Sequence, residues 1–103
     1  MVNDNIAACV DESEVWNLDE TFYSWLYERL KLYIKVASGI VDLNYHKFEY
    51  EGKSYTQLQM INLMVERLEF YFSPEFDGWK REHTDFVLEA AKIWAIVLPA
   101  MWV

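Results

Sequence analysis

The side chains that could do chemistry in this sequence are carboxylates and aromatic rings near its N-terminal end. The segment from Met1 to Glu28 contains no Lys or Arg, so all of its charged side chains are acidic. They are Asp4, Asp11, Glu12, Glu14, Asp19, Glu20 and Glu28. Their summed field attracts a basic protein surface and disfavours nucleic acid and anionic membranes, which bind clustered Lys and Arg. Tyr and Trp in the same segment are typical of interface hot spots.

These residues predict a surface that binds a basic protein partner, without direct binding to nucleic acid or membrane. The candidate residues are Asp11, Glu12, Glu14, Trp16, Asp19, Glu20, Tyr23 and Tyr27. Solubility, or the preference of helix starts for acids, would also explain the charge. The tyrosines would equally fit a core boundary at which their hydroxyls reach water.

Catalysis, a cofactor and a bound metal have little support in the sequence, so we expect a non-enzymatic protein; Asp11, Glu12 and Glu14 could attract a divalent cation but lack the ligand alternation and central Gly of a calcium loop. The two histidines, His46 and His83, belong to no metal-ligand spacing, and His83 is expected to be solvated at a helix start. Cys9 is the only cysteine, which excludes an intrachain disulfide, and no neighbouring base activates its thiol. A reducing, cytoplasmic location is expected, since Asn3 to Ala8 has no export-signal pattern.

The elements that position these residues are predicted to be helices. A chain of 103 residues with 53% hydrophobic residues suits one compact domain. Its apolar periodicity predicts an all-α fold, a three-helix bundle over residues 1–103, with residues 1–14 as a flexible or extended arm.

The first helix is expected from Leu18 to Ser38. Asn17 and Glu20 fit a capping box; if Asp19 is the cap instead, Leu18 and Tyr23 make a hydrophobic staple. In either case Trp16 and Leu18 are expected to hold the entering chain against the helix. The apolar positions form one stripe and a flank beside it: Phe22, Leu26, Leu30, Tyr33, Ala37 and Ile40, then Trp25, Leu32 and Val36.

Between the first two helices the sequence allows two structures. Lys47 to Tyr50 could pair with Lys53 to Tyr55 as a small hairpin, or the segment could be an ordered loop. The second helix is expected from Thr56 to Tyr71, opened by a capping box of Thr56 and Gln59 and ended by Ser73-Pro74. Its inward positions are Leu58, Ile61, Met64, Val65, Leu68 and Phe72.

The third helix is expected to begin at Lys80 or Thr84 and to end at Leu98. Its inward positions are Phe86, Ala90, Ile93, Trp94, Val97 and Met101, and further apolar residues cover most of its circumference. The run from Phe86 to Val103 is interrupted by charges and a proline, so a membrane span is not expected. A helix this apolar also suits self-association as a homodimer, with candidate residues Trp94, Leu98, Met101 and Trp102.

One part of the chain resembles a group of small acidic proteins encoded by bacteriophages and prophages, in which Trp-x-Leu-Asp opens a helix. The matching residues are Asp11, Trp16-Asn17-Leu18-Asp19, Arg29-Leu30-Lys31 and Thr56, over about half the chain. Trp25 to Glu28 departs from the pattern, which has a proline near the arginine. The group has no established activity, so the resemblance implies a phage or mobile-element origin and action in the cytoplasm of a bacterial host.

Three functions are compatible with these observations. The first is an interaction protein that docks its acidic, aromatic face on a basic host protein and inhibits it, for example a nucleic-acid-binding or defence protein. The second is a homo-oligomeric assembly factor that uses the third helix. The third is a small-molecule binding domain with an aromatic pocket.

Overall fold

The structure is a computed structural model that describes residues 15–101. Within that range the helices are α2 (Leu18–Ala37), α3 (Gln57–Tyr71) and α4 (Arg81–Val97), and the strands are β1 (Lys47–Tyr50) and β2 (Lys53–Thr56). A short 3-10 helix, η2 (Leu98–Ala100), follows α4. The arm predicted for residues 1–14 lies outside the described residues.

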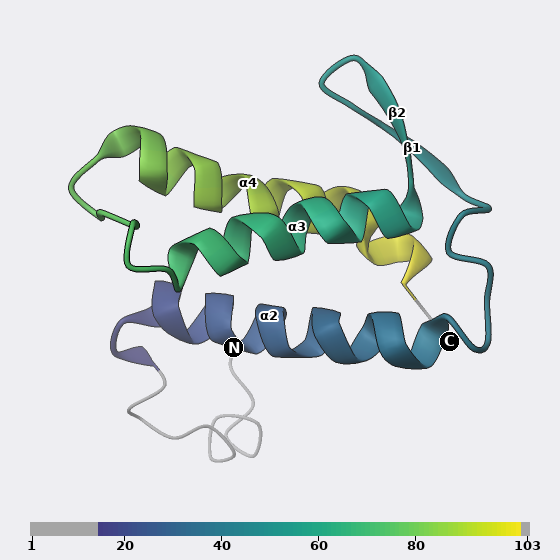
Figure 1. Ribbon diagram of the computed structural model, residues 1–103, viewed down its shortest axis with the longest axis horizontal. Coiled ribbons are helices and arrows are strands. Elements are labelled where there is room, and N and C mark those ends of the chain that lie inside the picture. Colours follow the sequence, from purple (N-terminus) through teal and green to yellow (C-terminus); the bar gives the residue numbers. More distant parts are fainter. Residues whose placement is uncertain (1–14, 102–103) are drawn as a thin grey trace, which may run out of the picture.

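The central helix is α3, which packs against both α2 and α4. Figure 1 shows α2 and α3 side by side and running in opposite directions, so the N-terminal half of α2 lies beside the C-terminal half of α3. The three predicted helices are confirmed, and their ends lie within one residue of the expected positions when Lys80 is taken as the start of the third; the alternative start at Thr84 is three residues too late. The fully buried core side chains come from all three helices: Leu26, Leu30, Ala37, Met60, Ile61, Met64, Leu68, Val87, Ala90, Ile93 and Val97.

The prediction of an all-α fold is wrong, because the segment that connects α2 to α3 in the chain contains β1 and β2, which form a two-stranded antiparallel sheet. Of the two structures that the sequence allowed here, the hairpin is the one present, with Phe48 opposite Tyr55. Glu51 and Gly52 both have positive φ, 51° and 76°, as a two-residue type I′ turn requires. Phe48, Tyr50 and Tyr55 pack on the helical core, which supports a hairpin that would be marginal alone.

The two predicted capping boxes have opposite outcomes. At α3 the Thr56 hydroxyl accepts from the backbone N–H of Gln59, and the Gln59 side chain accepts from the backbone N–H of Thr56, as predicted. At α2 the prediction is wrong, since Asn17 is left-handed (φ 51°, ψ 54°) and its side chain makes no capping bond. Asn tolerates this conformation better than most residues, so it turns the chain into the helix rather than capping it.

The apolar flank of α2 is also different from the prediction. Trp16 and Leu18 are 66% and 60% exposed, so they do not hold the entering chain against the helix. Ile40, at the end of the predicted stripe, is exposed, and so are the three residues of its flank, Trp25, Leu32 and Val36. Phe72, predicted to face inward at the end of the second helix, is exposed as well. The main helix neighbour of α2 is α3, and α4 reaches α2 through the ring contact of Trp94 with Trp25. The apolar stripe of α2 is wider than these contacts cover.

A polar cluster joins α3, α4 and the hairpin at the edge of the core. The Arg67 guanidinium donates from Nε to Glu89 (3.1 Å) and from Nη1 to the backbone oxygen of Leu63 (3.1 Å). The same guanidinium lies over the Phe86 ring, 4.7 Å from its centroid. Burial, followed by the charges of Glu89 and Glu51, raises the pKa of Tyr50 to about 12.

The shift at Tyr50 predicts a loss of stability in alkali. Between pH 10 and 12 the folded chain keeps the Tyr50 proton while the unfolded chain has lost it, so the free energy of unfolding falls as pH rises through this range. Because the ring is only partly buried, we expect its share to be about 1 kcal/mol. Urea unfolding at pH 9 and pH 11.5 should show a smaller fall for Tyr50→Phe than for the unaltered chain.

Tyr45→Phe is the matched control for this measurement, since Tyr45 is 75% exposed. It should leave the alkaline fall unchanged. An identical fall in all three proteins would contradict the assignment to Tyr50.

None of the helices found within residues 15–101 has the length and apolar content needed to cross a membrane.

Candidate functional site

The candidate site is a surface shared by α2 and α3, which we call the acidic face. It consists of Asp19, Glu20 and Glu28 of α2, Glu69 of α3, and the aromatic residues Tyr23, Tyr27, Tyr71 and Phe72. Three contacts between the helices hold it together. The Tyr27 hydroxyl donates to Oε2 of Glu69 (3.1 Å), the Tyr23 ring meets Tyr71 edge-on at 4.8 Å, and the Tyr27 ring lies 5.7 Å from that of Phe72.

The pKa values of the tyrosines in the acidic face are raised by burial and by the nearby carboxylates. Burial, followed by the charge of Asp19, raises the pKa of Tyr23. Burial raises the pKa of Tyr27, and the hydrogen bond and charge of Glu69 raise it further. Burial and then Asp19 and Glu20 raise the pKa of Tyr71. Carboxylates from two helices therefore act on one set of rings.

The carboxylates of the acidic face are not neutralised by ion pairs. Across residues 15–101, the acids that form ion pairs are Glu66, Glu89 and Asp85, all outside this face. Helix capping explains only part of the set. Asp19 and Glu20 lie in the first turn of α2, where the helix dipole favours acids, but Glu69 lies in the last turn of α3, where it disfavours them.

A groove in the acidic face lies where α2 crosses the end of α3. It is lined by Ser24, Tyr27, Glu28, Glu69 and Phe72 and has a volume of about 480 Å³. The rings of Tyr27 and Phe72 are tilted by 53° to each other, and a carboxylate comes from each helix. The groove thus combines aromatic faces with negative charge, an arrangement that suits a cation.

The structure brings together four of the predicted partner-binding residues: Asp19, Glu20, Tyr23 and Tyr27. Trp16 is exposed at the entrance to α2, and within residues 15–101 no ring contact joins it to these tyrosines. Asp11, Glu12 and Glu14 lie outside the described residues. The sequence-based prediction omitted Glu28, Glu69, Tyr71 and Phe72, of which three come from α3 and its C-cap. An acid in the last turn of a helix without a base beside it was the available signal for Glu69.

The residues predicted for self-association lie near the end of α4. Trp94 is partly buried and meets Trp25 of α2 edge-on at 6.1 Å, Leu98 is exposed, and Met101 packs partly against the core. Trp102 lies outside the described residues. Self-association through this end of α4 stays a prediction.

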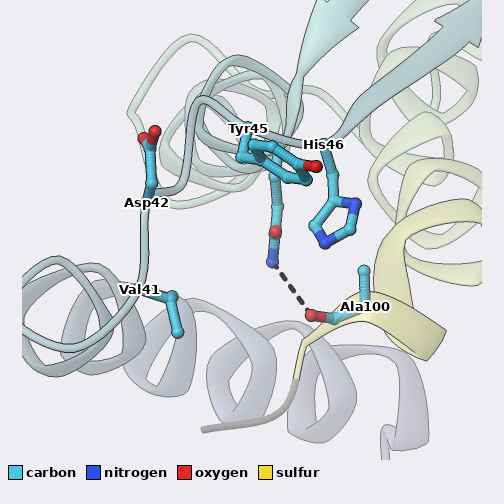
Figure 2. A pocket seen from close by; sticks show the side chains of 6 residues that line it. Val41, Asp42, Tyr45, His46 and Ala100 are labelled. Carbon is cyan, nitrogen blue, oxygen red and sulfur yellow. Dashed lines mark hydrogen bonds between the residues drawn. The ribbon is translucent and has the colours of Figure 1, made fainter.

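A second cavity, of about 280 Å³, lies between the loop after α2, the start of α3 and η2. Figure 2 shows Tyr45 and His46 on one side of it and Ala100 on another, with the Gln57 amide bonded to the Ala100 carbonyl. Gln57 is 2% exposed, and its Nε2 donates to Tyr33 (3.2 Å) and to the Ala100 oxygen (3.4 Å). Because this amide is engaged within the protein, the cavity gives the small-molecule hypothesis little support.

The environment of His83 differs from the expected one. His83 is not simply solvated, because its Nδ1 accepts from the backbone N–H of Asp77 (3.0 Å) and its ring packs on Phe70 at 4.9 Å. No group of three or more His, Cys, Asp or Glu in the described range is arranged to hold a metal ion.

Comparison of the chain with protein-family models, with curated proteins and with solved structures gave no match. The resemblance to small acidic phage proteins therefore stays a prediction.

Proposed function

We propose that this chain is a non-enzymatic interaction protein that binds a basic protein surface with its acidic face. The observation that carries the proposal is a set of four carboxylates from two helices, around partly buried tyrosines, that form no ion pair with any residue from 15 to 101. A basic partner would supply the missing counter-charges. The tyrosines would add contact area at a small cost in side-chain entropy.

The charge distribution along the chain supports the same proposal. Met1 to Glu28 contains no Lys or Arg, so the acids that α2 contributes to the face are preceded in sequence by further acids, and Arg29 and Lys31 follow them. Such a field accelerates encounter with a basic protein and suppresses encounter with acidic ones. If the phage-type resemblance holds, the partner is a bacterial host protein, and inhibition by covering a surface that binds nucleic acid is the most direct consequence.

The test is capture of basic proteins from a bacterial lysate by the immobilised full chain at rising salt. Neutralising the acidic face should weaken capture about tenfold or more, because electrostatic association falls with each lost charge. The variant replaces the four acids of the face: Asp19→Asn, Glu20→Gln, Glu28→Gln and Glu69→Gln. The bound proteins are identified and then tested singly as purified proteins.

A control variant with the same change in net charge replaces exposed acids elsewhere: Glu49→Gln, Glu51→Gln, Glu75→Gln and Glu82→Gln. It should retain the partners captured by the unaltered chain. Equal capture by the two variants would reject the acidic face as the binding surface.

A further inference from the structure

We propose that the groove between α2 and α3 receives an arginine side chain of the partner. This inference rests on the proposed function and names the chemistry that the acidic face recognises. The groove is the one lined by Ser24, Tyr27, Glu28, Glu69 and Phe72.

The aromatic walls of the groove suit a flat cation. The Tyr27 and Phe72 rings both line the groove. Their centroids lie 5.7 Å apart with a tilt of 53°, so the rings pack against each other and a cation would stack on the face of one ring. A guanidinium is planar and weakly hydrated, and it stacks on aromatic faces more readily than an ammonium does. The walls therefore favour arginine over lysine.

The carboxylates of the groove suit the donors of a guanidinium. Glu69 uses Oε2 to accept from Tyr27, a bond that holds the carboxylate at the groove while its other oxygen stays available. Glu28 contributes a second carboxylate, from the opposite helix, and forms no ion pair within the described residues. A guanidinium presents five N–H donors in a fixed, planar fork that matches carboxylate geometry, whereas the three donors of an ammonium radiate from one point.

The chain's own cations show the same preference. The guanidinium carbons of Arg29 and Arg67 lie 4.6 Å and 4.7 Å from the centroids of Trp25 and Phe86. The ammonium of Lys31 lies 6.0 Å from the Tyr27 centroid, at the edge of cation–π range. Lys31 is therefore a weak internal competitor for one wall of the groove.

The experiment is an NMR titration of the full chain with two acetylated and amidated peptides of equal charge, Gly-Ser-Arg repeated three times and Gly-Ser-Lys repeated three times. We expect the arginine peptide to bind about threefold to tenfold more tightly and to shift the signals of the groove residues. Phe72→Leu keeps an apolar side chain at an exposed position and removes one of the two aromatic rings while Tyr27 remains, so it should reduce the preference for arginine.

Lys31→Gln should tighten binding of the arginine peptide about twofold or more, because it removes the competing cation. Lys35→Gln makes the same change in charge one turn further along α2 and should have a smaller effect. Equal binding of the two peptides, binding of neither, or a preference that Phe72→Leu leaves unchanged would overturn the proposal. If both peptides bind equally and neutralising the acidic face weakens both, the acidic face remains the binding surface and only the arginine groove is rejected.

Discussion

Truncating Leu68 to alanine is expected to lower the free energy of unfolding by about 2 to 5 kcal/mol. Leu68 is fully buried on α3, the helix that contacts both of the others. The substitution removes apolar contacts and leaves a cavity that the two neighbouring helices cannot both close. Urea unfolding followed by circular dichroism measures the loss as a lower midpoint at an unchanged slope.

Leu88→Ala is the matched control, because it makes the same chemical change on α4 at a side chain that is 46% exposed. Its effect should be within about 1 kcal/mol, since little burial is lost and alanine favours the helix. Similar losses at both positions would mean that α3 is not the centre of the core.

Replacing Arg67 by alanine is expected to cost about 2 to 3 kcal/mol, somewhat less than for a fully buried ion pair. The Arg67 side chain is only 12% exposed, and it connects Glu89, the Leu63 carbonyl and the Phe86 ring. Its loss leaves Glu89 partly buried without its counter-charge. Arg67→Lys should recover only part of the loss, because an ammonium cannot stack on Phe86 and keep both hydrogen bonds.

Arg81→Ala tests whether burial is the reason for the large cost expected at Arg67. Arg81 also forms an ion pair, with Asp85 at 3.6 Å, but its side chain is 90% exposed. Removing it should change the free energy of unfolding by about 0.5 kcal/mol or less. Equal costs at Arg67 and Arg81 in the same urea series would show that the polar cluster contributes no more than a surface pair.

Local signals in the sequence predicted the helices well. The Thr56 capping box and the Ser73-Pro74 stop depend only on neighbouring residues, so they could be recognised without the fold. Asn17 and Glu20 carry a similar pattern, but the left-handed backbone at Asn17 depends on how the preceding chain enters the helix. The hairpin needed the core as support for its aromatic residues, and the sequence alone left the choice between hairpin and loop open.

Only the part of the candidate site that lies on α2 could be predicted from the sequence. Asp19, Glu20, Tyr23 and Tyr27 lie within nine residues of chain, so one helical pattern joins them. Glu69 and Phe72 join them only because α2 and α3 run in opposite directions with a particular offset. That offset comes from the packing of the two helices on a shared core, which no short stretch of sequence specifies.

The bond between Tyr27 and Glu69 joins residues that are 42 positions apart in the chain. The groove beside it therefore exists only in the folded protein, and anything that fills it binds the native state in preference to the unfolded one. By mass action, an occupant present at about one hundred times its dissociation constant raises the free energy of unfolding by about 2.7 kcal/mol. The melting temperature of the chain is thus itself an assay for its partner, one that needs no label and works with any candidate that can be added in excess.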